Sequence, residues 1–116
     1  MKTELEERTK KFAVQVVRTV AAFPKTAEGH VLGRQLLRAG TSIGANYREA
    51  NRAESKNDFV HKIGVAEKEA AETIYWLEIC QDVKLGVAPS IAELLNEAGQ
   101  LLAILVTIGR KAKTKS

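Results

Sequence analysis

The chain has 116 residues, of which 45% are hydrophobic and 28% are charged, and this is the composition of one globular domain with a real core. No continuous apolar run approaches about 18 residues, so we expect no contact with a membrane, and the charged N-terminus lacks the apolar segment of a signal peptide. The single cysteine, Cys80, excludes an internal disulfide and favours a cytoplasmic location.

The net charge of +4 is mildly basic, but the charges are separated along the chain. Residues 29–56 contain five basic and two acidic residues, a net charge of +3. Residues 57–82 contain two basic and six acidic residues, a net charge of −4. This separation predicts one basic and one acidic element.

Apolar residues at helical spacing recur through the whole chain, and no strand-like alternation interrupts them. We therefore expect an all-α protein with a single domain over residues 1–116. The expected helices span about residues 4–22, 27–53, 56–83 and 91–111. Their expected N-caps are Thr3, Thr26, Ser55 and Ser90. Pro24 and Pro89 mark helix boundaries.

The helix expected at 27–53 carries three separate faces. Its apolar face holds Leu32, Leu36, Ala39, Ile43 and Ala50. An arginine stripe lies within about 40° of the opposite direction, at 100° per residue, and consists of Arg34, Arg38, Arg48 and Arg52. A third strip consists of glycines, so we expect another helix to cross closely at Gly40 and Gly44. Asn46 borders the apolar face and needs a hydrogen-bond partner within this helix packing.

The helix expected at 56–83 has two apolar stripes, although the core of a monomer needs only one. The second stripe predicts an interface with another copy of the chain. Its candidate residues, with two neighbouring acids, are Val65, Glu69, Glu72, Trp76, Ile79 and Val83. The wide apolar arc of the helix expected at 91–111 supports the same expectation.

No pattern in the sequence indicates catalysis, a metal or a cofactor. His30 and His61 are the only histidines, which is too few for most zinc sites, and the one Asp58-Phe-Val-His61 segment lacks the second copy that a di-iron site requires. Cys80 lies among apolar residues and is expected to be an inert packing residue.

The arginine stripe is therefore the main candidate site, and three interpretations remain open. The stripe could be a solvated face. It could pair with Glu69 or Glu72 of a neighbouring subunit. It could also contact nucleic-acid phosphates, because repeated arginines at helical spacing suit a polyanion.

The sequence resembles the bacterial four-helix-bundle family known as 23S rRNA intervening-sequence proteins or S23 ribosomal proteins. The resemblance covers about residues 10–85. It is carried by Phe23-Pro24-Lys25, Gln35–Ala39, Ser42–Asn46, Glu49-Ala50, Asp58-Phe59, Lys68-Glu69-Ala70, Glu72 and Tyr75-Trp76-Leu77.

This resemblance implies an up-down-up-down antiparallel bundle, a homopentameric ring and no enzymatic activity. The accessory protein of diversity-generating retroelements is similar, and it is a basic pentamer that binds nucleic acid. We therefore expect a non-enzymatic module that binds RNA or DNA backbone. The alternative is a scaffold that binds a partner protein and has no nucleic-acid role.

Overall fold

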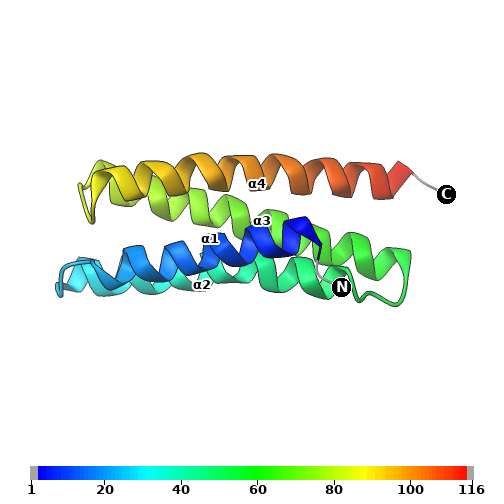
Figure 1. Cartoon of the computed structure of the whole chain (residues 1–116), viewed down its shortest axis with the longest axis horizontal. Coiled ribbons are helices and arrows are strands. Elements are labelled where there is room, and N and C mark those ends of the chain that lie inside the picture. The colour runs from blue at the N-terminus through cyan, green and yellow to red at the C-terminus, as the bar shows by residue number, and fades with distance from the viewer. Residues whose placement is uncertain (1–2, 115–116) are drawn as a thin grey trace.

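The computed structural model describes residues 3–114 and contains four antiparallel helices (Figure 1). They are α1 (Glu4–Ala21), α2 (Ala27–Ala50), α3 (Lys56–Asp82) and α4 (Ala88–Thr114). Each helix packs against the next in the chain, and α4 returns to α1, where the contact is the least extensive of the four. The described chain has no strand, so the expected all-α bundle is confirmed.

Three of the four expected N-caps are confirmed. In each, the hydroxyl group accepts a hydrogen bond from the backbone N–H three residues further on, at 3.0–3.1 Å. This bond satisfies one of the amides that has no partner inside the first turn of a helix. The three caps are Thr3, Thr26 and Ser55.

The expected start of α4 is wrong. The helix begins at Ala88 rather than Ile91, so Ser90 lies inside the first turn and does not cap it. Pro89 does not delay the start, because amides of a first turn have no helical acceptor and the fixed φ of proline suits this position. The preceding chain turns at Lys84 and Gly86, both with positive φ.

The expected end of α2 also differs from the structure. The helix ends at Ala50 and not at residue 53. The next amides bond three residues back, from Arg52 to the Glu49 carbonyl and from Ala53 to the Ala50 carbonyl, each at 3.0 Å. Arg52 therefore follows the helix in a tight turn.

Helix α1 crosses α2 closely along the glycine strip, as the sequence predicted. A Cβ atom on Gly40 would lie 2.9 Å from Val16 Cγ2, and one on Gly44 would lie 2.8 Å from Thr9 Oγ1. Thr9 and Val16 are fully buried. A larger residue at either glycine would force the buried Val16 or Thr9 to shift.

All four helices contribute side chains to one core. Its largest fully buried side chains include Phe12, Leu36, Ile43, Ile63, Leu77, Ile91, Leu101 and Leu105. Within the core, the Thr73 hydroxyl donates a hydrogen bond to the Glu69 backbone carbonyl at 2.7 Å, so the buried hydroxyl of Thr73 has a partner.

Helix α4 is long and apolar enough to cross a membrane by length and composition alone, and the sequence analysis did not anticipate this property. Core helices of soluble proteins can pass the same test. Here α4 packs against α3 and α1, and less than a third of its most apolar stretch is buried within the chain. Much of the apolar surface of α4 is thus at least partly exposed.

Candidate nucleic-acid interface

The four arginines of the stripe diverge, because three leave α2 in different directions and Arg52 lies beyond its end. At 100° per residue, Arg38 and Arg48 are turned by about 40° to opposite sides of Arg34. Arg52 follows the helix in a turn. Helix α3 lies on one side of α2 and helix α1 on the other. This small difference in angle decides which arginines reach a neighbouring helix.

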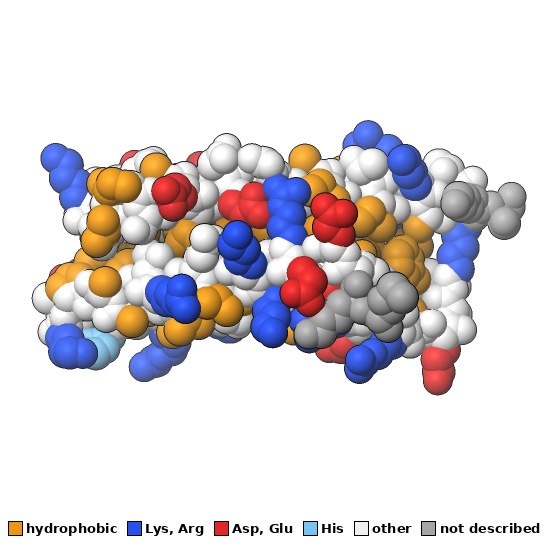
Figure 2. Space-filling model, in the orientation of Figure 1, with side chains coloured by type: hydrophobic (Ala, Val, Ile, Leu, Met, Phe, Trp, Pro, Cys, Tyr) orange, Lys and Arg blue, Asp and Glu red, His pale blue; other side chains and the backbone are white. Residues whose placement is uncertain are grey.

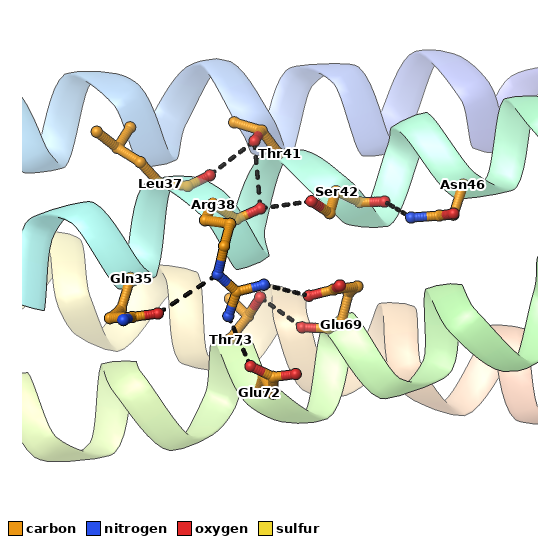
Figure 3. A network of polar contacts seen from close by, with 9 residues as sticks. All are labelled: Gln35, Leu37, Arg38, Thr41, Ser42, Asn46, Glu69, Glu72 and Thr73. Carbon is orange, nitrogen blue, oxygen red and sulfur yellow. Dashed lines mark hydrogen bonds and ion pairs between the residues drawn. The ribbon is translucent and has the colours of Figure 1, made fainter.

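Arg38 reaches α3 and binds two carboxylates there (Figure 3). Its Nη2 lies 2.6 Å from Glu72 Oε1, and its Nη1 lies 3.2 Å from Glu69 Oε1. The hydrogen bond that Arg38 donates to Glu72, with a smaller contribution from Glu69, raises the pKa of the Arg38 guanidinium. The sequence left open a pairing of this stripe with Glu69 or Glu72 of a neighbouring subunit, and the structure places the pairing of Arg38 within one chain.

Arg48 reaches α1. Its Nε lies 3.8 Å from Glu6 Oε1, and its Nη2 is buried without a hydrogen-bond partner. The other oxygen of Glu6 accepts a hydrogen bond from Asn51 Nδ2 at 2.8 Å. Glu6 therefore ties the start of α1 to the end of α2, and Arg48 contributes to that junction.

Arg34 and Arg52 are the two arginines of the stripe that stay available. Both are exposed, and neither forms an ion pair with another part of residues 3–114. Arg34 lies within α2, whereas Arg52 lies in the turn beyond the end of that helix. The continuous stripe predicted from the sequence is thus reduced to two separated cations.

Asn46 has the hydrogen-bond partner that its position required. Its Nδ2 donates to the Ser42 carbonyl at 2.8 Å, and the Ser42 hydroxyl donates to the Arg38 carbonyl at 2.6 Å (Figure 3). These bonds stay within α2, so they stiffen one helix and do not join two.

The second stripe of α3 is only partly exposed. Val65, Trp76 and Ile79 are half-buried, and Val83 is 59% exposed. Trp76 packs against the core of its own chain and meets the exposed Tyr75 ring edge-on, at 5.0 Å between centroids. Trp76 therefore has a role within the chain, and the interface itself stays a prediction.

Basic side chains are distributed unevenly over the surface. In Figure 2, acidic groups lie beside basic ones in the middle of the visible face, whereas basic and histidine side chains gather at the lower left. That end of the α1–α2 pair is where the two helices are joined (Figure 1). Sequence reasoning missed two residues of this region, Lys25 and His30, which share a cleft with Arg34.

Other reactive groups do not converge in the described part of the chain. Within residues 3–114, no three His, Cys, Asp or Glu side chains are grouped to hold a metal ion. His30 and His61 are both exposed. Cys80 is fully buried, and this burial raises the pKa of its thiol, which lowers its reactivity.

The fold and these contacts define an antiparallel four-helix bundle whose ion pairs within residues 3–114 join neighbouring helices. The family model described as "23S rRNA-intervening sequence protein" matches residues 1–107. The chain therefore belongs to the 23S rRNA-intervening sequence protein family.

A solved structure agrees with this assignment. It is a protein of unknown function from the S23 ribosomal protein family of Bacteroides thetaiotaomicron, and it is 35% identical to this chain. The alignment covers 90% of this chain and 96% of that protein, with a TM-score of 0.83. Among curated proteins, none matches this chain.

Proposed function

We propose that this protein is a non-enzymatic, cytoplasmic module that assembles with itself and binds the backbone of a nucleic acid. The observation that carries the proposal is the pair of exposed arginines, Arg34 and Arg52, which have no carboxylate partner in the described chain. They belong to the basic segment of residues 29–56. A free guanidinium can bind a phosphate in bidentate fashion without first giving up an internal partner.

Self-assembly would make these few contacts effective. The partly exposed apolar surface of α4 and the exposed Tyr75 and Val83 of α3 offer surface for contact with other copies. We extend the proposal to a homopentameric ring, the assembly that the family resemblance implies. A ring would repeat Arg34 and Arg52 in each subunit, and repetition of weak phosphate contacts raises the overall affinity.

RNA is the first nucleic acid to test, since the family name refers to an intervening sequence of 23S rRNA. The test compares two double variants by fluorescence anisotropy with a short labelled RNA. We expect Arg34→Gln with Arg52→Gln to weaken binding by about tenfold or more and to flatten its salt dependence.

The matched control is Arg38→Gln with Arg48→Gln, which removes the same number of positive charges from the same stripe. It should weaken binding less, because Glu69 and Glu72 hold the Arg38 guanidinium and Arg48 Nε lies 3.8 Å from Glu6 Oε1, at the α1 side of the bundle. If the two double variants lose RNA affinity equally, or if neither loses any, then Arg34 and Arg52 are not the phosphate-binding residues.

The alternative function is a scaffold for a partner protein, and the exposed apolar residues favour it. On that account the assembly persists but does not bind RNA even at low salt. A salt-sensitive RNA complex would argue against the scaffold, because phosphate contacts weaken steeply between about 50 and 200 mM salt.

A further inference from the structure

A cleft of about 340 Å³ opens at the end of the bundle where α1 passes into α2. One wall is apolar, and the rim is basic. The residues that define its character are Val20, Phe23, Lys25, His30, Arg34 and Leu37. None of the described residues that line it is acidic.

The wall of this cleft is held firmly in place. Phe23 is buried, and its ring packs against Gly86 of the α3–α4 connection, where a Cβ atom would lie 2.7 Å from Phe23 Cε1. On the α2 side, a Cβ atom on Gly33 would lie 3.0 Å from Val20 Cγ1. Glycines at both positions let the turn pack tightly, so the cleft is preformed.

The rim carries positive charge that the chain does not neutralise. Lys25, His30 and Arg34 are exposed and have no side-chain partner in residues 3–114. The groove between α1 and α4 differs, because there Arg8 binds Glu97 at 2.7 Å. The cleft at the α1–α2 turn is thus prepared for an anion from outside the chain.

We propose that this cleft binds one nucleotide that carries a terminal phosphate, either free or at the end of a nucleic acid. Lys25 and Arg34 would hold the phosphate, and the sugar and base would lie against Val20 and Leu37. This inference rests on the proposed function, because both assign phosphate binding to Arg34.

Charge and size both favour a terminal nucleotide. A phosphate monoester carries nearly two negative charges at neutral pH, whereas an internal phosphodiester carries one, so a cluster of basic side chains favours the monoester. The volume of about 340 Å³ lies at the lower end of the range for small-molecule sites, which runs from about 300 to 1,000 Å³, and this size suits a single nucleotide.

The test uses adenosine monophosphate, adenosine, and one short RNA prepared with a terminal phosphate or a terminal hydroxyl. Calorimetry should show adenosine monophosphate binding at least about tenfold more tightly than adenosine. The phosphorylated RNA should likewise bind more tightly than its hydroxyl form.

Two variants locate the site while leaving Arg34 unchanged. Lys25→Gln with His30→Gln should greatly weaken the preference for the terminal phosphate, because only Arg34 then remains to hold it. Ala21→Trp should fill the cleft from its exposed edge and block adenosine monophosphate without altering the charge. Arg52→Gln, the control at the opposite end of α2, should leave the preference intact.

The outcomes separate this inference from the proposed function. Adenosine monophosphate binding without any RNA binding would support the cleft and overturn the nucleic-acid function. RNA binding with no preference for a terminal phosphate, and no binding of adenosine monophosphate, would overturn the cleft alone. Unchanged binding of adenosine monophosphate by the Ala21→Trp variant would also overturn it.

Discussion

Replacing Gly44 with alanine tests the close contact between α1 and α2. Inside a helix, alanine is favoured over glycine by about 1 kcal/mol. The new Cβ atom would lie 2.8 Å from Thr9 Oγ1 and 3.4 Å from the Thr9 backbone carbon. Thr9 is fully buried, and its hydroxyl donates to the Glu6 carbonyl at 3.1 Å, so it has little freedom to move away.

Overpacking of this kind costs about 1–3 kcal/mol. We therefore expect the Gly44→Ala variant to be equal to or less stable than the parent, despite its better helix propensity. Gly44→Leu should lower the free energy of unfolding by about 1–3 kcal/mol. Urea denaturation at one fixed protein concentration measures these changes, since dissociation of an assembly would otherwise contribute.

Gly64 provides the matched control, because among residues 3–114 a Cβ atom there would have no neighbour within 4 Å apart from the nearby backbone of its own helix. Gly64→Ala should raise the free energy of unfolding by about 1 kcal/mol. Thr9→Ala should lower the free energy of unfolding less in the Gly44→Ala variant than in the parent, because it relieves the close contact in that variant. If Gly44→Ala and Gly64→Ala stabilise the protein equally, the reasoning about the close contact is refuted.

Three further predictions concern the ion pair of Glu97, the burial of Cys80 and the assembly. The hydrogen bond from Arg8 lowers the pKa of Glu97, so the charged form of Glu97 stabilises the fold above its ordinary pKa, and this contribution is lost as pH falls through the lowered value. From about pH 7 to about pH 3, urea titrations should show a larger loss of stability for the parent than for Glu97→Gln; equal losses would contradict this. Cys80 should react with a thiol reagent only after unfolding, and rapid labelling of the native protein would contradict its burial. Light scattering should give a mass several times 12.7 kDa, and both Trp76→Glu and Val83→Glu should lower it; a monomeric parent would exclude the interface.

The sequence predicted the helices well because their signals are local. The caps at Thr3, Thr26 and Ser55 depend on residues three positions apart, and the glycine strip depends on one helical period. The error at α4 has a physical reason. Pro89 and Ser90 fit a helix start at either of two nearby positions. The contact between Gly86 and Phe23 also shapes the connection, and a contact between residues so far apart in the chain cannot be read from local sequence.

The candidate site was less predictable because it depends on which helices flank α2. Periodicity gave the direction of Arg38 and Arg48 about the axis but not the neighbour that each side chain reaches. The cleft was missed for the same reason, since the turn brings Lys25 beside Arg34 in space. The Phe23-Pro24-Lys25 turn, followed by Gly29 and Gly33, indicates a tight connection between two helices. Which side chains line a cleft there depends on how the helices pack.

Native mass spectrometry of the untagged protein with a short RNA at low salt tests the proposed function most directly. We predict assemblies at a multiple of 12.7 kDa that carry RNA and release it as the salt concentration rises. A 12.7 kDa monomer that binds no RNA at low salt would contradict both the assembly and the nucleic-acid function.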